Sequence, residues 1–447
     1  MRTVIHNAMV VTMDKQRRVL EHSDILIEDS RIAAVGDAGK AKPDRLIDGT
    51  GRIVLPGFIC GHTHLYGVML RGAPLKMKPP LDFRQILDRV WWNVDAAFTN
   101  EDAYASALIA SYELVRSGST CFADTYSGPG SINRVLDDIA KGVSEVGLRG
   151  ILAFEATERN SPEEGKQGLQ ENVRFLKRLQ HHPQDLLHGM YSLHASFTLS
   201  DELIRRTREQ ADKLPAPITI HTSEGLIDVY HNLERYDKRT VERLFDLGLL
   251  GSDVVLAHCV HVNADELQLI RGSGASVAHN PMSNMNNAVG VAPIKEMLEL
   301  GIPVCLGNDG FIFDALENIR CAFLIHRVHH RDPRVTTPDQ ILEIATIRGA
   351  EAYGLAKELG SIEPGKRADL VILHPNPRAT PILPAGVASY IVYGLTAHSV
   401  ETVFVNGNPV VENHRVTTVE TQTIEKVMDR VVPRLWAKLG IDVPPSR

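Results

Sequence analysis

Six side chains suited to metal binding or proton transfer fall at the ends of apolar, strand-like runs of this sequence. The first run, residues 55–64, ends in His62 and His64. Alternate side chains of an extended strand point to the same face, so these two imidazoles can bind one metal ion. Three later runs end in the same way and supply His221, Glu224, His258 and Asp309.

The ligand types indicate which metal such a site would bind. Imidazole nitrogens with one carboxylate suit zinc or iron(II) better than magnesium, which prefers oxygen ligands. We therefore predict one divalent metal, zinc first and iron as the alternative, bound by His62, His64, His221 and Asp309. Such an ion lowers the pKa of bound water to about 7 and generates hydroxide at neutral pH.

Three of these residues are candidates for proton transfer and catalysis. Glu224 lies three residues beyond His221 and is placed to carry a proton between water and substrate. His258 can orient the hydroxide or polarise the electrophile, and Asp309 can take the proton from the water. Groups of this kind typically contribute about 10²–10⁴-fold to the rate.

Each residue also has a plain structural interpretation. A single strand histidine is usually a hydrogen-bonded core residue, and Asn-Asp-Gly at 308–310 is a strong turn signal. The Glu-Gly pair at 224–225 can be a solvated loop. Because all of these residues end strands, their convergence at one place favours the metal site.

The elements that position these residues alternate between strand and helix patterns. Apolar strand candidates occupy residues 58–64, 120–125, 149–155, 187–194, 218–221, 254–258, 276–279 and 304–307. Amphipathic helix patterns lie between them. An open doubly wound sheet is the structural alternative, but no Gly-rich phosphate loop follows any strand. Eight such units over about 300 residues predict an α/β fold with a (β/α)₈ TIM-type barrel, whose catalytic groups lie at the carboxyl ends of the strands.

Both ends of the chain have strand patterns instead. Residues 1–56 contain short strands separated by turns, and strands return at 368–373, 391–393 and 399–405 before a helix at 421–439. We predict a barrel domain of residues 57–359. A small composite β-sandwich domain would then be built from residues 1–56 and 360–447.

Composition and charge limit the possible partners. A chain of 447 residues with a net charge of −7 has no excess of basic residues to attract nucleic acid. No signal peptide and no membrane-spanning run are expected. The five cysteines form no C-x-x-C pair, as in a reduced protein, so we expect a cytoplasmic protein that binds a small molecule.

The motifs resemble those of the amidohydrolase superfamily over nearly the whole chain. The match begins with Pro-Gly-Phe at 56–58 before the two histidines. It continues with His-x-x-Glu at 221–224, Ala-His-Cys at 257–259, His-Asn-Pro-x-Ser-Asn at 279–284 and Leu-Gly-Asn-Asp-Gly at 306–310. Residues 360–370 resemble the family's return to its composite β domain. The motifs look like the branch of cytosine, guanine and S-adenosylhomocysteine deaminases and s-triazine hydrolases, and Trp91-Trp92 with residues 283–290 looks closest to SsnA-type aminohydrolases.

The resemblance implies the same four metal ligands and the same three proton-handling residues. It also implies that His194 contacts the substrate. Binuclear relatives use a carboxylated lysine on the fourth strand, and residues 187–197 contain no lysine, which favours one ion. Some relatives use a glutamate at the end of the third strand for metal, so a second ion at Glu155 stays open, although a substrate or structural role is favoured.

The connection at residues 65–95 is long for a strand-to-helix loop, and such loops are usually functional or disordered. Its apolar and aromatic side chains can stack on a flat heterocycle while a cation meets a polar substituent. We predict that Trp92 and Arg71 bind substrate and that the loop lies over the metal.

The resulting expectation is hydrolytic deamination of an aminated nitrogen heterocycle such as a purine, pyrimidine or pterin, with release of ammonia. An s-triazine chloro- or aminohydrolase and a cyclic-amide hydrolase use the same metal site and remain alternatives. A non-catalytic scaffold is a distant third, because a scaffold has no need of converging ligands. We expect a homodimer or higher homo-oligomer.

Overall fold

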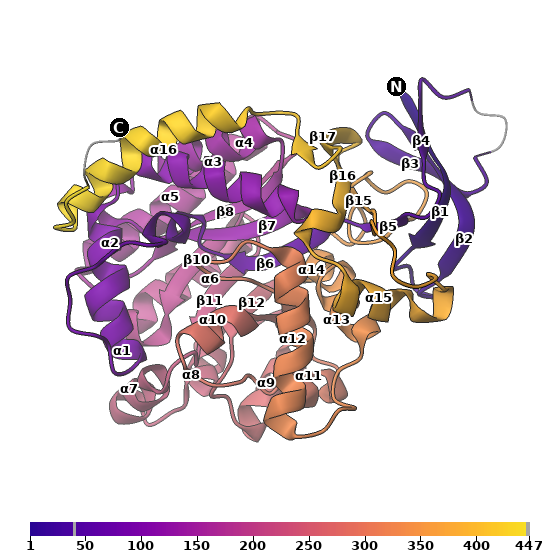
Figure 1. The fold of residues 1–447 in the computed structure, drawn as a ribbon. Helices are drawn as coiled ribbons and strands as arrows, with labels where there is room; N and C mark the ends of the chain where they lie inside the picture. Colours follow the sequence, from indigo (N-terminus) through magenta and orange to yellow (C-terminus); the bar gives the residue numbers. More distant parts are fainter. Residues whose placement is uncertain (39–41, 444–447) are drawn as a thin grey trace.

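A ring of eight parallel strands lies at the centre of the described residues, which are 1–38 and 42–443 of this computed structural model (Figure 1). In order around the ring they are β6 (Phe58–Thr63), β7 (Ser119–Tyr126), β8 (Arg149–Ala156), β10 (Tyr191–Ala195), β11 (Ile218–Thr222), β12 (Val254–His258), β13 (Ser276–His279) and β14 (Val304–Leu306). Thr63 forms a parallel bridge with Asp309, which joins the first strand to the chain just after the last. The predicted barrel is confirmed.

Helices surround this ring. The longer ones are α3 (Asn100–Arg116), α4 (Val135–Val146), α5 (Pro162–His181), α6 (Asp201–Lys213), α7 (Leu226–Tyr236), α9 (Ala264–Ser273), α12 (Ala315–His330) and α16 (Thr421–Lys438). The shorter ones are α1 (Phe83–Ile86), α2 (Trp92–Ala97), α8 (Thr240–Asp246), α10 (Pro281–Asn286), α11 (Ile294–Leu300), α13 (Pro338–Ile344), α14 (Ile347–Ala352) and α15 (Val387–Gly394). Local sequence sets several starts: a capping box of Thr99 and Asp102 begins α3, and Ser161 caps α5 ahead of Pro162.

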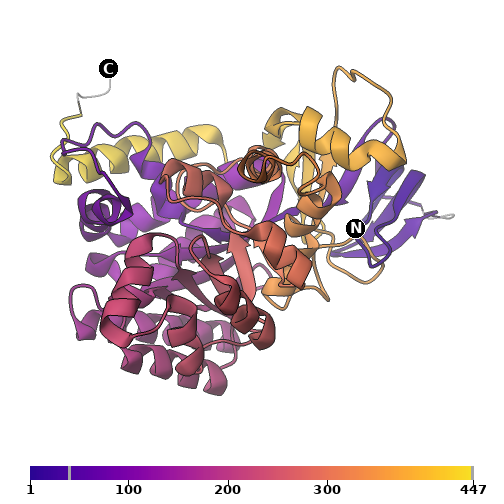
Figure 2. The same ribbon diagram turned by 90° about the horizontal axis from the view of Figure 1, so that it is seen from below.

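Strands from both ends of the chain form a second, mixed sheet beside the barrel (Figures 1 and 2). Its order is β18 (Arg415–Val416), β17 (Asn408–Glu412), β16 (Val400–Val405), β15 (Leu370–Leu373), β5 (Ile53–Pro56), β1 (Arg2–Val11), β2 (Val19–Glu28) and β3 (Arg31–Gly36), with β4 (Arg45–Asp48) paired to β1. The two ends meet where β15 runs antiparallel to β5, with Leu370 opposite Pro56.

A buried ion pair joins the sheet to the barrel. Arg149, at the start of β8, donates from Nε to Oδ2 of Asp369, next to β15, at 3.1 Å. Each side chain is 3% exposed. Asp369 also accepts a hydrogen bond from the backbone of Asn406. The pair therefore links the amino-terminal end of a barrel strand, the end away from the predicted site, to the second sheet.

Two segments differ from the prediction. Residues 391–393, predicted as strand, lie in α15, because the buried residues Val387, Ala388, Ile391 and Val392 recur with helical spacing. The fourth strand is divided into β9 (Leu187–Gly189) and β10, both of which pair with β8.

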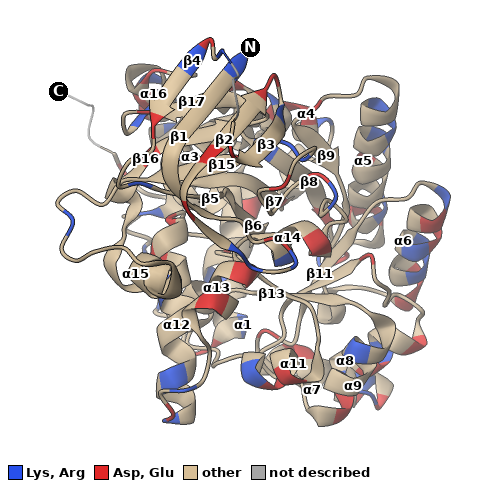
Figure 3. Ribbon diagram, turned by 90° about the vertical axis from the view of Figure 1, so that its right-hand side faces the viewer, with Lys and Arg blue, Asp and Glu red and all other residues tan. Residues whose placement is uncertain are grey.

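The surface carries both signs of charge. Figure 3 shows basic and acidic residues mixed along outer helices such as α6, α8 and α11. Within the described ranges, no helix combines the length and apolarity needed to cross a bilayer. All five cysteines, which lie in the described part, carry free thiols.

Candidate metal centre and active site

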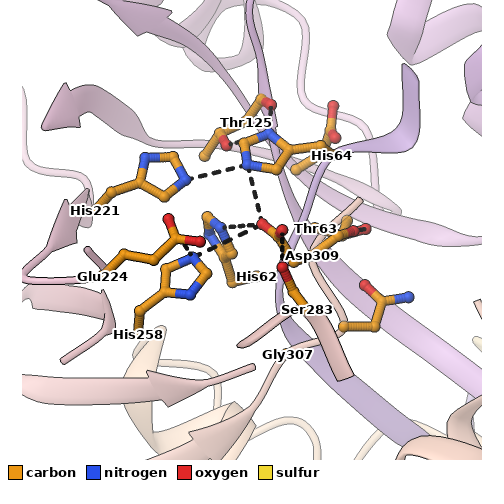
Figure 4. A network of polar contacts seen from close by, with 12 residues as sticks. His62, Thr63, His64, Thr125, His221, Glu224, His258, Ser283, Gly307 and Asp309 are labelled. Carbon is orange, nitrogen blue, oxygen red and sulfur yellow. Dashed lines mark hydrogen bonds and ion pairs between the residues drawn. The ribbon is translucent and has the colours of Figure 1, made fainter. Parts of the chain in front are cut away.

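Asp309 is the central residue of a buried polar cluster at the carboxyl ends of the strands (Figure 4). Its Oδ1 lies 3.2 Å from Nε2 of His62 and 3.2 Å from Nε2 of His64. The backbone fixes this contact, because Asn308 N donates to His62 O and His64 N donates to Asp309 O. The closure of the barrel between β6 and β14 thus brings together residues almost 250 positions apart.

His221 and His258 complete the cluster from β11 and β12. His221 Nε2 lies 3.1 Å from His64 Nε2, and His258 Nε2 lies 3.8 Å from Asp309 Oδ1. Ligand atoms of His62, His221, His258 and Asp309 all lie within 4.8 Å of one another, a grouping able to hold a metal ion. The structure therefore places His258 in the same cluster as the four predicted ligands, slightly farther from Asp309 than His62 and His64 are.

Three of the imidazoles are oriented by hydrogen bonds through their other nitrogen. Nδ1 of His64 donates to the carbonyl of Thr125 at 2.7 Å, and Nδ1 of His221 donates to that of His194 at 2.8 Å. Nδ1 of His258 lies 2.8 Å from Oδ1 of Asn284. A carbonyl oxygen only accepts, so Nε2 of His64 and His221 is left free to bind a metal, an arrangement typical of metal-binding histidines.

The charges of the cluster fit a cation. Burial alone would lower the pKa of His64, but the carboxylate of Asp309 outweighs it and raises the pKa to about 10. Burial would raise the pKa of Asp309, but the charge of His64 and hydrogen bonds from both histidines hold it well below its usual value. Among the described residues, buried Nε2 of His258 has no hydrogen-bond partner. A divalent ion would replace the proton on His64 and balance the buried charge of Asp309.

Glu224 lies beside this cluster in the loop after β11. Its Oε2 is 3.5 Å from Nε2 of His258, and its Oε1 accepts a hydrogen bond from Asn287 at 3.2 Å. Burial raises the pKa of Glu224 from 4.5 to about 7, and the nearby His258 moderates the rise. A carboxyl group that exchanges its proton near neutral pH suits general acid–base chemistry.

A cavity opens over the cluster. Its walls are formed by His64, Tyr66, Phe83, Leu87, Trp91, Trp92, Asp95, Glu155, Arg159, His194, Ala195, Phe197, His221, Glu224, Gly225, Asp228, Asn287 and Asp309. Six of these residues come from residues 65–97, which follow His64 and precede α3. That segment consists of a 3-10 helix (Leu65–Leu70), α1, a π turn (Leu87–Trp91) and α2. Side chains of the predicted loop therefore line the cavity.

The predicted substrate-binding residues are placed differently from one another. Trp92, His194 and Glu155 line the cavity. His194 Nε2 lies 3.9 Å from Glu155 Oε1, and burial raises the pKa of Glu155 to about 7. Arg71 does not line it: its Nε donates to Phe311 O at 2.6 Å and its Nη1 to Glu113 at 2.7 Å. The Arg71 side chain makes these contacts outside the cavity, because the 3-10 helix ends just before Arg71 and directs the side chain towards α3.

The cation that does line the cavity is Arg159, four residues beyond Glu155. Its Nη2 lies 2.7 Å from Oδ2 of Asp95, and both side chains are almost completely buried. Its guanidinium also lies over the ring of Trp92, 5.5 Å from the centroid. Sequence reasoning missed both residues, although a charged residue just beyond a strand end was an available signal.

The motif at 279–284 contributes residues around the centre. Ser283 donates to Oδ2 of Asp309 at 2.6 Å, and Asn284 contacts His258 as described above. His279 meets His326 of α12, with 3.0 Å between their Nε2 atoms. His326 is buried, because its face of α12 packs against the barrel. His329 and His330 sit further out on the same helix.

The chain is similar to known proteins over most of its length. Residues 53–410 match the model of the amidohydrolase family. The chain belongs to this family. It is 33% identical to 5'-deoxyadenosine deaminase of Methanosarcina mazei over 442 residues, which are 98% of this chain and 99% of the relative. It is also 33% identical to 5-methylthioadenosine/S-adenosylhomocysteine deaminase of Syntrophomonas wolfei, over 95% of this chain and 97% of the relative.

Solved structures have the same fold. An adenosine deaminase from Xanthomonas campestris with bound zinc superimposes with a TM-score of 0.86 at 24% identity, over 96% of this chain and 98% of the other. The atrazine chlorohydrolase TrzN from Arthrobacter aurescens, complexed with zinc, gives a TM-score of 0.85 at 26% identity over 96% and 100%.

Proposed function

We propose that this protein is a metal-dependent deaminase of adenine nucleosides modified at the 5' position, such as 5'-deoxyadenosine, 5'-methylthioadenosine or S-adenosylhomocysteine. The observation that carries the proposal is the 33% identity to a 5'-deoxyadenosine deaminase over almost the whole length of both chains. The predicted reaction class, hydrolytic deamination of an aminated nitrogen heterocycle, is the one that the names of these relatives give.

We assign the metal to His62, His64, His221 and Asp309, with zinc as the ion. Oδ1 of Asp309 lies 3.2 Å from Nε2 of both His62 and His64, and Nε2 of His221 lies 3.1 Å from that of His64, which supports this choice, as do the zinc-bound neighbours in fold. An ion held there supplies Lewis-acid activation of a water molecule. His258, whose Nε2 lies 3.5 Å from Glu224, would orient such a water molecule, and Ser283 holds the second oxygen of Asp309.

The protein's own groups would move the protons. Water adds to the amino-bearing ring carbon, and Glu224 carries one of its protons to the adjacent ring nitrogen. Asp309 takes the second proton and passes it to the amino group, after which the carbon–nitrogen bond breaks and ammonia leaves. The pKa of Glu224 near 7 supports this role, because the group both accepts and returns a proton at neutral pH.

The cavity wall supports a flat, polar substrate. Trp92 and Phe83 offer faces for an aromatic ring, and His194 and Glu155 offer polar atoms deep in the cavity. The buried pair of Asp95 and Arg159 offers one acceptor and one cation, which suit hydroxyl groups and an anionic or polar 5' substituent.

The test is ammonia release by the zinc-loaded protein from a panel of 5'-deoxyadenosine, 5'-methylthioadenosine, S-adenosylhomocysteine, adenosine, guanine, cytosine and atrazine. We expect the highest kcat/KM with a 5'-modified adenine nucleoside. Failure to release ammonia from every adenine nucleoside by protein with full metal occupancy would reject the proposal. The likeness to TrzN makes triazine hydrolysis the second candidate, and release of chloride from atrazine would support it.

A further inference from the structure

The carboxyl-terminal helix α16 reaches the segment that walls the cavity. It runs along α3, and its last turns lie beside α2 (Figure 1). The indole Nε1 of Trp436 donates to the carbonyl of Met69 at 2.8 Å, and Nζ of Lys438 donates to the carbonyl of Ala97 at 2.9 Å. We call residues 65–97 the mouth segment.

The two acceptors lie near opposite ends of the mouth segment. Met69 is in the 3-10 helix that starts directly after His64, and Ala97 is the last residue of α2. Between them are the cavity-lining side chains Phe83, Trp92 and Asp95. One helix from the far end of the chain therefore holds both ends of the segment that would meet the substrate.

The same turns of α16 also hold the start of α3. Arg434 donates to Glu101 at 2.6 Å and to Asp102 at 3.3 Å, and Asp102 belongs to the capping box of α3. The first turn of α16 has a different attachment, where Thr421 meets the hydroxyl of Tyr112 at 3.0 Å near the other end of α3. The links to the mouth segment are thus confined to the last turns.

The helix is anchored independently of these two hydrogen bonds. Ile424, Val431 and Leu435 recur on one face of α16 and are almost completely buried. Removing the side-chain donors of Trp436 and Lys438 would free the mouth segment without detaching the helix, because burial of apolar surface supplies most of its attachment.

We propose that Trp436 and Lys438 are positioning residues for substrate binding. They hold the two ends of the mouth segment so that Tyr66, Trp92 and Asp95 keep their distance from the metal centre. The cavity volume is about 50 Å³, whereas pockets that enclose small ligands measure about 300–1,000 Å³. In so small a cavity, the room left for a substrate depends on where the two ends of the segment are held. The kinetic part of this inference rests on the proposed function.

The experiment uses the zinc-loaded, full-length protein with Trp436→Phe and Lys438→Met combined. Two hydrogen bonds of ordinary strength are lost, so we expect KM for the preferred nucleoside to rise about tenfold. We expect kcat within about twofold and metal content per chain unchanged, because the metal ligands and Glu224 lie outside the mouth segment. Amide hydrogen exchange in peptides covering 65–70 and 92–97 should become faster.

Two further variants sharpen the test. Thr421→Val removes a hydrogen bond of the same helix away from the mouth segment and should leave both KM and exchange unchanged. Lys438→Arg combined with wild-type Trp436 keeps a donor and should stay close to wild type.

The outcomes separate this inference from the proposed function. Unchanged exchange at 65–70 and 92–97 in the double variant overturns the inference, and so does a joint loss of metal and kcat, which would mark a general structural role. If the wild-type protein deaminates no adenine nucleoside, the proposed function fails, whereas the exchange measurement still decides whether α16 holds the segment.

Discussion

At the scale of single residues, the first test concerns the metal. His62→Ala removes one imidazole and leaves the proposed site one ligand short, so we expect most of the bound zinc and the activity to be lost while the fold persists. Elemental analysis of the purified variant measures this directly. The control is His181→Ala, which changes an exposed histidine of α5. Full zinc occupancy in His62→Ala would contradict the ligand assignment.

The second test separates metal binding from proton transfer. Glu224→Gln keeps the size of the side chain and its contact with Asn287 but removes the titrating carboxyl group. We expect zinc content to be unchanged and kcat to fall by about 10² or more. Glu234→Gln, at an exposed position of α7, serves as the matched control. Loss of zinc from Glu224→Gln would make Glu224 a ligand instead.

The residues of the metal centre were predictable because each stands at the end of an apolar run, and parallel strands in a barrel bring such ends together. Asp95 and Arg159 were not, because the direction of a loop side chain depends on tertiary packing. Arg71 shows the same limit: its charge was visible in the sequence, but its pairing with Glu113 depends on where α3 lies.

At the scale of elements, α12 supplies a prediction about pH. Burial lowers the pKa of His326 from 6.5 to about 4, so its imidazole is neutral in the folded protein. Between pH 6.5 and 4 the unfolded chain binds a proton that the folded chain does not. This group therefore lowers the free energy of unfolding by up to about 1.4 kcal/mol per pH unit as pH falls.

Chemical denaturation at several pH values checks this. His326→Gln should reduce the slope of unfolding free energy against pH over that window, whatever its effect on stability at neutral pH. His181→Gln should leave the slope as in wild type. An equal slope in His326→Gln and wild type would contradict the assignment of a neutral, buried imidazole.

Element types were predictable where the hydrophobic period was long and regular, as in α5 and the barrel strands. The short run at 391–393 was misassigned because three apolar residues fit either period, and only the buried neighbours Val387 and Ala388 reveal the helix. The start of helix α7 carries no local signal, since Gly225 precedes it and provides no capping side chain.

At the scale of the whole molecule, the Arg149–Asp369 pair joins the barrel to the mixed sheet. Arg149→Met leaves the Asp369 carboxylate buried without its charge partner, so we expect a loss of about 3–5 kcal/mol in unfolding free energy. Arg348→Met, which removes a partly exposed pair with Glu351, should cost no more than about 1 kcal/mol. Denaturant titration compares the two, and equal losses would contradict a special role for the buried pair.

Two predictions about the whole molecule stay predictions. One is the division into a barrel of residues 57–359 and a β domain of 1–56 with 360–447, of which 39–41 and 444–447 lie outside the described residues. The other is a homodimer or higher homo-oligomer, which sedimentation of the purified protein would measure.

The pairing of β5 with β15 has a consequence for synthesis on the ribosome. Leu370 lies opposite Pro56, so one edge of β5 stays unpaired until β15 is synthesised, more than 300 residues later. At a translation rate of about 5–20 residues per second, the interval between synthesis of β5 and of β15 is roughly 15 to 60 seconds. During this time the nascent chain presents an unpaired strand edge, a known starting point for aggregation. The amino-terminal strands are therefore the part of the nascent chain that a chaperone would protect from aggregation.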